Sequence, residues 1–469
     1  MLLKNVQWIS ESGKLSRGNI LIKNGKISQL VPIFNSSDPN SSFSENSFLF
    51  LPGFIDPHVH FRQPGQFYKE GIKNGAKAAL AGGVTTVLDM PNNQPPCENR
   101  EVFNIKRKLF EKNSLVNWGL HVLDGKFFQQ ETPKVSFASI KVFFSKSGKA
   151  QIIHSSEELT DLFEKYKSVS IHVEDESCFI QNFQDHSGPP LPHHESRPRE
   201  AIISGLKRLD KAIKIFFSRN SGKKLPRIVL LHLSTEEEVH WLNSRKKQGL
   251  DIWGETSPHY LFYTYKDVES SKNLLKVNPP IRDERDRQAL REAVKNKLID
   301  FIGSDHAPHA LKEKLSPTPP SGIPGIEHFG PLLLQLLEEG LIDWSRLLEL
   351  GCKKAANCYS IKGRDGIKET NFADLVLYSR APSVRDSSPN KNTVSKVFEN
   401  RLVTKAGYNP YPDIQFIWKV EEVFVNGVQS FSQNFENVGE CVSPDNPHKI
   451  FIWANSINSK EVYENNRFF

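Results

Sequence analysis

Eight short apolar segments recur between residues 53 and 305 of this chain, and helical patterns separate most of them. Strands that alternate with helices pack as a parallel sheet covered by helices. Eight such units predict an α/β fold of the closed (β/α)8 TIM-like type, with a doubly wound open sheet as the alternative. The candidate strands span residues 53–60, 84–90, 116–122, 138–144, 169–174, 228–234, 252–257 and 300–305.

The helical segments have apolar residues at the spacing of an amphipathic helix. Two begin with Ser followed three residues later by Glu, at Ser155…Glu158 and Ser234…Glu237, which predicts capping boxes. The expected helices are Lys69–Ala81, Arg100–Lys112, Ser156–Lys167, Pro198–Arg219, Glu236–Lys247 and Glu284–Leu298.

Both ends of the chain have strand character. Asn24-Gly25 between two apolar segments predicts a two-residue hairpin, and FADLVLYS and WKVEEVFVNGVQSF are similar segments near the other end. We therefore expect residues 1–50 and 366–430 to form one small β-sandwich domain. Residues 51–365 would be the barrel, and residues 431–469 a C-terminal extension.

Composition excludes several classes of protein. The chain is 38% hydrophobic and 25% charged, which is typical of globular proteins and not of disordered or collagen-like chains. No apolar run is long enough to span a membrane, and the start lacks a signal-peptide pattern. The net charge of +7 is spread along the chain, so we expect a solvated basic surface and no nucleic-acid partner. Five cysteines without a Cys-x-x-Cys pair indicate reduced thiols and a cytoplasmic protein.

His58 and His60 stand one residue apart on the first candidate strand of the barrel. Side chains at i and i+2 of a strand share a face, so both imidazoles can reach one metal ion. His172, His232 and Asp305 each stand at or near the end of another candidate strand. Catalytic residues of a barrel of this type cluster at these ends, so the five residues predict a metal site.

Lys141 stands on a further candidate strand. An ordinary lysine there would extend its ammonium to solvent, and beside metal ions it would be repelled. Addition of carbon dioxide would convert the amine into a carbamate, an anion able to bridge two cations. Spacing does not decide between the two forms of Lys141.

Two motifs give a resemblance to a known family: DPHVHFRQP at residues 56–64, and GSDHAPH at 303–309 followed by Lys314. GGVTTVLDMPNNQPP (82–96), GETSPHYLF (254–262) and NPPIRDERDRQAL (278–290) support it. Through these motifs the chain resembles the dihydroorotases, cyclic amidohydrolases of the amidohydrolase superfamily. The resemblance covers residues 51 to 430.

The resemblance implies a zinc site with two metal ions. His58, His60 and Asp305 match ligands of one ion, and His172 and His232 match ligands of the other. Lys141 matches the carboxylated lysine that bridges the ions in many members. One branch of the family uses an aspartate from a Ser-Asp-Asp-Gly segment instead. Here residues 145–148 read Ser-Lys-Ser-Gly, which favours Lys141.

The reaction implied is the reversible cyclisation of N-carbamoyl-L-aspartate to L-dihydroorotate, a step of pyrimidine synthesis. Asp305 would relay the proton between water and the leaving nitrogen. The planar fork of Arg62 can bind the substrate carboxylate with two hydrogen bonds. The resemblance adds Asn92 and His309 as partners of Arg62 on that carboxylate, and Asn278 and the Gly322 loop as further substrate contacts.

Other interpretations stay open. Allantoinases and dihydropyrimidinases would share the metals and the barrel, and HESRPREAI at residues 194–202 is somewhat similar to theirs. A non-catalytic scaffold is less favoured, because none of the six candidate ligands is missing. Residues 307–325 form either a lid or an inert connection. The partner is a small-molecule substrate, and the sequence leaves a homo-oligomer open.

Overall fold

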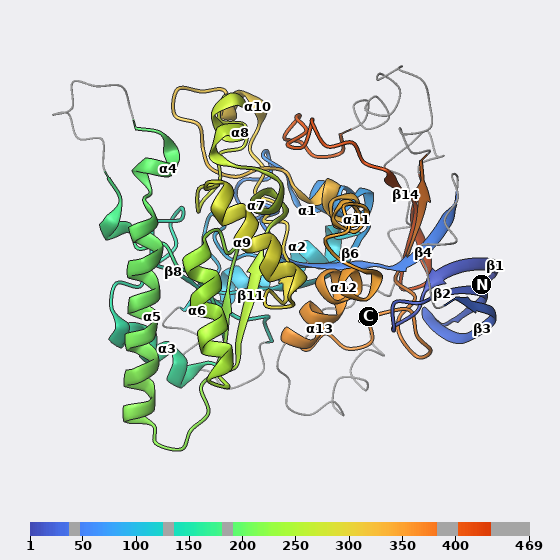
Figure 1. The fold of residues 1–469 in the computed structure, drawn as a ribbon, viewed down its shortest axis with the longest axis horizontal. Helices are drawn as coiled ribbons and strands as arrows, with labels where there is room; N and C mark the ends of the chain where they lie inside the picture. The colour runs from blue at the N-terminus through green and yellow to red at the C-terminus, as the bar shows by residue number, and fades with distance from the viewer. Residues whose placement is uncertain (37–46, 125–135, 181–190, 382–401, 433–469) are drawn as a thin grey trace.

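The computed structural model describes residues 1–36, 47–124, 136–180, 191–381 and 402–432 (Figure 1). Its larger part contains eight parallel strands, each of which coincides with a predicted one. The strands are β5 (Phe54–Val59), β6 (Val84–Asp89), β7 (Asn117–Leu120), β8 (Ile140–Phe143), β9 (Ser168–His172), β10 (Arg227–Leu230), β11 (Ile252–Thr256) and β12 (Phe301–Ile302).

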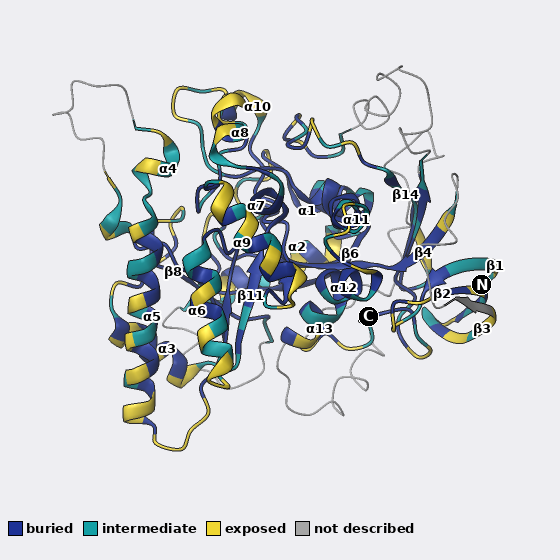
Figure 2. Ribbon diagram, in the orientation of Figure 1, coloured by how far each residue is buried: buried dark blue, intermediate teal, exposed yellow. Residues whose placement is uncertain are grey.

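The eight strands form a closed ring. One sheet has the order β5-β6-β7 and a second the order β12-β11-β10-β9-β8. Parallel bridges between Val122 and Ile140, and between Val59 and His306, join the two sheets at both edges. The barrel is therefore confirmed over the open sheet. Its strands are buried on both faces, as the dark blue centre of Figure 2 shows, because helices cover the ring.

The helices lie around the ring and expose one face to solvent (Figure 2). Helix α1 begins at Ile72 and not at Lys69, because Gly71 has a φ of +86° and interrupts the helical backbone. The helices are α1 (Ile72–Ala81), α2 (Arg100–Asn113), α3 (Ser156–Lys165), α4 (His193–Ser196), α5 (Arg199–Arg219), α6 (Glu236–Lys247), α7 (Pro258–Phe262), α8 (Tyr265–Ser270), α9 (Glu284–Lys295), α10 (Leu311–Lys314), α11 (Phe329–Glu338), α12 (Trp344–Leu348) and α13 (Lys354–Cys358).

The two predicted capping boxes differ in outcome. Ser155 caps α3 by accepting a hydrogen bond from the Glu158 backbone N–H, but the Glu158 carboxylate accepts from the His154 backbone N–H at 3.0 Å, so the first box is only half formed. The second prediction, at Ser234, is wrong by one residue: the box of α6 consists of Thr235 and Glu238. Glu238 is buried at the helix start, whereas Glu237 points outward and pairs with Arg199.

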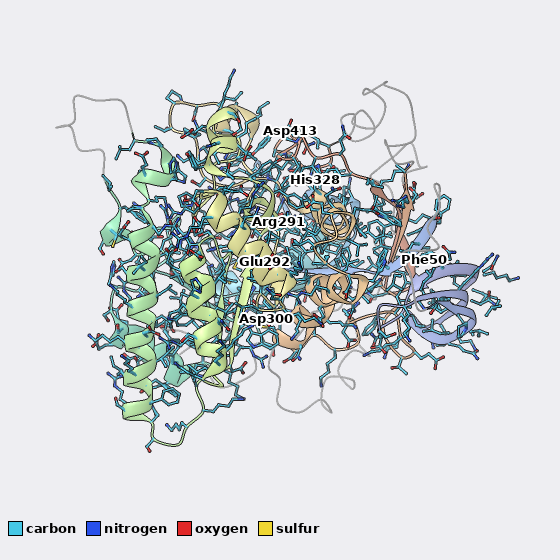
Figure 3. The ribbon with its side chains drawn as sticks, viewed as in Figure 1. Phe50, Arg291, Glu292, Asp300, His328 and Asp413 are labelled. Carbon is cyan, nitrogen blue, oxygen red and sulfur yellow. The ribbon has the colours of Figure 1, made fainter. Side chains whose placement is uncertain are left out.

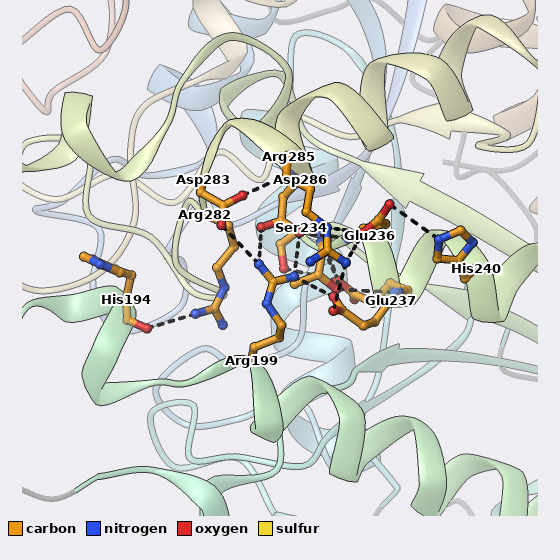
Figure 4. A network of polar contacts seen from close by, with 12 residues as sticks. His194, Arg199, Ser234, Glu236, Glu237, His240, Arg282, Asp283, Arg285 and Asp286 are labelled. Atoms are coloured by element: carbon orange, nitrogen blue, oxygen red, sulfur yellow. Dashed lines mark hydrogen bonds and ion pairs between the residues drawn. The ribbon is translucent and has the colours of Figure 1, made fainter.

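Arg199 at the start of α5 connects three helices (Figure 4). Its Nη1 lies 2.6 Å from Glu237 of α6 and 2.7 Å from Asp286 of α9, and its Nη2 lies 2.6 Å from the same aspartate. This shared guanidinium sets the spacing of α5, α6 and α9 outside the ring.

The smaller part of the protein is a seven-stranded sheet built from both chain ends, in the order β15-β14-β13-β4-β1-β2-β3. Asn24 and Gly25 have φ values of 50° and 74°, which confirms the two-residue hairpin between β2 and β3. The strands are β1 (Leu2–Ile9), β2 (Leu15–Lys23), β3 (Lys26–Ser36), β4 (Phe48–Pro52), β13 (Leu375–Arg380), β14 (Trp418–Val425) and β15 (Val428–Ser432).

This sheet folds over a separate apolar core. An antiparallel β-bridge between Lys26 and Phe372 joins the β2–β3 turn to the segment before β13. Trp8, Phe50 and Phe424 are among the buried side chains enclosed there, and Figure 3 labels Phe50 beside the barrel. Residues 37–46 before β4, and residues 433–469 of the expected C-terminal extension, lie outside the described residues.

The two parts meet through buried polar groups. The Asn117 side chain of β7 donates to Asp374 at 3.1 Å and accepts from Asn426 at 2.9 Å. Arg364 also contacts Asp374. Within the described ranges no helix could span a membrane, and Cys97, Cys178, Cys352 and Cys358 are free thiols.

A fully buried ion pair supports the loop after β6. Lys106 of α2 has no exposed surface, and its Nζ lies 2.6 Å from Asp89 at the end of β6. The same ammonium donates to the Met90 carbonyl and to Asn93 Oδ1, at 2.6 and 2.8 Å. Asp89 in turn accepts from the Phe61 backbone N–H at 2.7 Å. The pair therefore fixes the ends of both β5 and β6.

Lys106→Met should lower the free energy of unfolding by about 3–5 kcal/mol, because it leaves the Asp89 charge buried without its partner. Urea unfolding measures the change. Lys108→Met is the matched control, since Lys108 is exposed on the same helix and its loss should change stability by less than about 0.5 kcal/mol. Equal stabilities of the two variants would show that the pair contributes nothing.

Candidate active site

Ring closure brings His58 and His60 of β5 against Asp305, which follows β12. The two Nε2 atoms lie 3.4 and 3.2 Å from Asp305 Oδ1, and the three ligand atoms lie within 4.8 Å of one another. Asp305 has a φ of +46°, a conformation that non-glycine residues rarely adopt and that clusters at functional sites. These residues form one compact group of two nitrogens and an oxygen.

His172 and His232 form a second pair beside the first group. Nδ1 of His172 lies 2.9 Å from Nε2 of His232, and the His232 ring centroid lies 5.3 Å from that of His58. His232 also has a positive φ, of 41°. The four histidines predicted as ligands therefore lie together, although they come from three separate strands.

Lys141 of β8 belongs to the same cluster. Only 2% of its surface is exposed, and Glu255 and Asp305 are close enough to influence its charge. Burial lowers the pKa of Lys141 to about 7, although the two carboxylates act in the opposite direction. A substantial fraction of this side chain is therefore the neutral amine near neutral pH, which is the form that reacts with carbon dioxide.

Three of the four imidazoles have their other ring nitrogen engaged by a neighbour. His58 Nδ1 lies 2.6 Å from Glu255, His60 Nδ1 lies 2.7 Å from Asn92 Oδ1, and His172 Nε2 lies 3.1 Å from Glu174. Metal-binding histidines usually have such outer partners, which fix the tautomer and the ring orientation. Arg197 keeps Glu174 in place at 2.6 Å.

Sequence reasoning assigned no role to Glu255 and Glu174. Glu174 stands two residues after His172, in the same i, i+2 relation that identified His58 and His60, so a signal existed. The only sequence signal at Glu255 was an acidic residue within a candidate barrel strand. Its contact with His58 joins residues 197 positions apart, which no local pattern reveals.

The donor set fits divalent metal ions such as zinc. Burial lowers the pKa of His58, His172 and His232, so these rings stay neutral and keep a nitrogen lone pair. Burial would raise the pKa of Asp305, but His58 and His60 outweigh it and hold the pKa below its usual range. Neutral imidazoles around a carboxylate are the ligands that zinc prefers.

The predicted substrate-binding residues come together only in part. Arg62 Nη2 lies 3.2 Å from His309 Nε2, and Gly322 packs against the same ring. Gly322 has a φ of +129°, and a Cβ there would lie 2.3 Å from the Ala307 carbonyl oxygen, so only glycine fits.

Asn92 and Asn278 make other contacts. Asn92 uses its oxygen for His60, and its amide donates to Ser147 Oγ at 3.0 Å. Ser147 belongs to the Ser-Lys-Ser-Gly segment that lacks a carboxylate. Asn278 Oδ1 faces His193 Nε2 at 3.0 Å, and among the described residues no hydrogen bond joins Asn278 to Arg62 or His309.

Lys314 fastens the segment that follows β12. Its buried ammonium donates to the carbonyls of Lys276, Pro320 and Gly322, each at 3.0 Å. The Lys314 Nζ thereby joins the Gly322 loop to the segment that contains Lys276 and Asn278. Part of the 307–325 segment is thus built into the site and is not a free surface connection.

Comparison with known proteins gives a consistent result. The model of the amidohydrolase family matches residues 49–429. A dihydroorotase of Pyrococcus abyssi is 31% identical over 410 residues, which are 87% of this chain and 89% of that protein. A dihydroorotase of Staphylococcus aureus is 30% identical over 404 residues, covering 80% and 88% of the two chains.

Solved structures share the fold. The L-hydantoinase (dihydropyrimidinase) of Arthrobacter aurescens superposes with a TM-score of 0.74 over 94% of this chain and 97% of its own, at 22% identity. The extent of the family match and the identity to the two relatives establish membership. This chain belongs to the amidohydrolase family.

Proposed function

We propose that this protein is a zinc-dependent dihydroorotase, which interconverts L-dihydroorotate and N-carbamoyl-L-aspartate in pyrimidine synthesis. The observation that carries the proposal is the Arg62–His309 pair beside the His58–His60–Asp305 group. A cyclic amide with a free carboxylate needs both features. The dihydroorotases that are 30–31% identical over most of this chain support it.

The residues that would hold metal are His58, His60 and Asp305 for one ion and His172 and His232 for a second, with Lys141 between them as its carbamate. Bound zinc would polarise the amide carbonyl and lower the pKa of a water molecule. Carbon dioxide adds to the neutral Lys141 amine, forming an N–C bond and releasing one proton. We also place the enzyme in the cytoplasm, where the free thiols of the described residues would stay reduced.

Asp305 would move the proton during ring opening. Its carboxylate takes a proton from the attacking water and delivers it to the ring nitrogen when the C–N bond breaks. Ring closure reverses these transfers. Glu255 and Glu174 would hold the tautomers of His58 and His172 throughout.

The alternative is a cyclic amidohydrolase whose substrate lacks a carboxylate, such as an allantoinase or a dihydropyrimidinase. The HESRPREAI segment that suggested it has contacts that serve the scaffold: Arg197 binds Glu174, and Arg199 connects α5, α6 and α9. These contacts say nothing about the substrate. A scaffold protein without activity does not account for six converging ligand-type side chains.

Arg62→Gln tests the substrate class. It should weaken dihydroorotate turnover by about 1.5–3 kcal/mol, the usual contribution of a hydrogen bond to a charged group, and leave the carboxylate-free dihydrouracil unaffected. Purified protein is incubated with dihydroorotate, dihydrouracil, hydantoin and allantoin, and ring opening is followed by absorbance. Faster opening of hydantoin or allantoin than of dihydroorotate would reject the proposal.

Lys141→Ala should abolish activity and reduce bound zinc, because the bridging anion is lost. Short carboxylic acids should restore part of both by taking its place. Metal analysis and carbon-13 NMR of protein equilibrated with labelled bicarbonate measure the ion content and the carbamate. Lys146→Ala is the matched control, since Lys146 is exposed five residues away. Full activity of the Lys141→Ala protein would show that Lys141 does not bridge the metal ions.

Asp305→Asn separates metal binding from proton transfer. Asparagine keeps a ligand oxygen but cannot accept a proton near neutral pH. We expect retained zinc and a kcat lower by about 10²–10⁴-fold, the usual loss when general acid–base catalysis is removed. Zinc analysis and steady-state kinetics provide both values. Normal turnover of Asp305→Asn with full zinc content would show that another group transfers the proton.

A further inference from the structure

Lys69, three residues before α1, lies in a setting unusual for a lysine. It is 7% exposed, and its Nζ lies 2.9 Å from His309 Nδ1 and 3.2 Å from Glu313. Its ammonium also lies 5.8 Å from the Tyr68 ring centroid. Burial lowers the pKa of Lys69, but its contact with Glu313 acts in the opposite direction and favours the charged form. The ammonium is therefore directed to one ring nitrogen of His309.

His309 is placed between two cationic donors. Lys69 faces Nδ1, and Arg62 faces Nε2 at 3.2 Å. A neutral imidazole has one N–H and one lone pair, so it accepts a hydrogen bond from only one of them. Burial and the two cations lower the pKa of His309, which keeps the ring neutral. In one of the two contacts, therefore, an N–H of the His309 ring faces an N–H of the cation, and no hydrogen bond can form there.

The surroundings indicate which contact is satisfied. The Lys69 contact is the shorter, and Glu313 holds the ammonium in place. Arg62, in contrast, has its Nε buried without a hydrogen-bond partner among the described residues. The lone pair of His309 then belongs on Nδ1 and the proton on Nε2. Arg62 Nη2 and the Nε2–H of His309 are then two donors that face each other at 3.2 Å.

We propose that Lys69 is a positioning residue that fixes the Nε2–H tautomer of His309, so that His309 and Arg62 jointly donate to a substrate carboxylate. An anion between these two side chains removes the donor–donor conflict and satisfies both. The identity of that anion as the dihydroorotate carboxylate rests on the proposed function. The assignment of the tautomer rests on the contacts around a neutral His309 ring and does not depend on the proposed function.

The tautomer is measured directly by nitrogen-15 NMR of histidine-labelled, zinc-loaded protein, with the His309 signals assigned from a His309→Gln variant. The wild-type protein should show a protonated Nε2 and an unprotonated Nδ1. Lys69→Met should shift the ring toward the other tautomer, and Lys69→Arg should retain the original one. A wild-type ring protonated at Nδ1 would overturn the proposal.

Kinetics and binding provide the second readout. Lys69→Met should raise the KM for dihydroorotate about tenfold, as expected for the loss of one hydrogen-bonding arrangement, with a smaller change in kcat and no change in zinc content. Lys69→Arg should recover most of the affinity. Lys73→Met is the matched control, because Lys73 is exposed on α1. An unchanged KM in Lys69→Met would reject the positioning role.

Orotate, which carries the same carboxylate and is not opened, separates this inference from the proposed function. Calorimetry should show that wild-type protein binds orotate and that Lys69→Met binds it about tenfold more weakly. If wild-type protein binds orotate with this dependence on Lys69 but opens no dihydroorotate, the proposed function fails and the inference stands. If dihydroorotate is opened and orotate affinity is equal in both proteins, the inference fails alone.

Discussion

The contact that closes the barrel is the one on which the site depends. Val59 of β5 pairs with His306, and the His60 backbone N–H donates to the His306 carbonyl at 2.8 Å. These bonds join the first strand of the ring to the last. Without them His58 and His60 would lie on one sheet edge and Asp305 on another, and no local interaction would bring the three together.

Sequence periodicity predicted the barrel well because the strands are largely buried on both faces and therefore rich in apolar residues. The histidine and aspartate candidates were recognisable for the same reason, since a polar residue at the end of an apolar strand is conspicuous. The outer partners were harder to identify. Glu255, Lys69 and Ser147 act through contacts with residues distant in sequence, and each alone is an ordinary polar residue.

The prediction at Ser234 failed by one residue because two neighbouring hydroxyl residues and three consecutive glutamates allow more than one capping register. Burial chose between them: Glu238 faces the barrel, and Glu237 faces Arg199. Asn92 shows a related limit. A motif match places it near a substrate, but its amide is already shared between His60 and Ser147, so its role depends on geometry that the motif does not contain.

The three carbonyls bound by Lys314 separate two parts of the segment after β12, one packed against the barrel and one outside it. His309 and Gly322 belong to the part that is held to the barrel. The Pro-rich stretch between Lys314 and Pro320 begins at Lys314 and ends where Pro320 accepts a hydrogen bond from the Lys314 Nζ. Because its two ends are held by the same ammonium, this stretch can differ in length or composition without displacing the residues inside it. The buried Lys314 ammonium thus marks the boundary between this Pro-rich stretch and the residues that line the site.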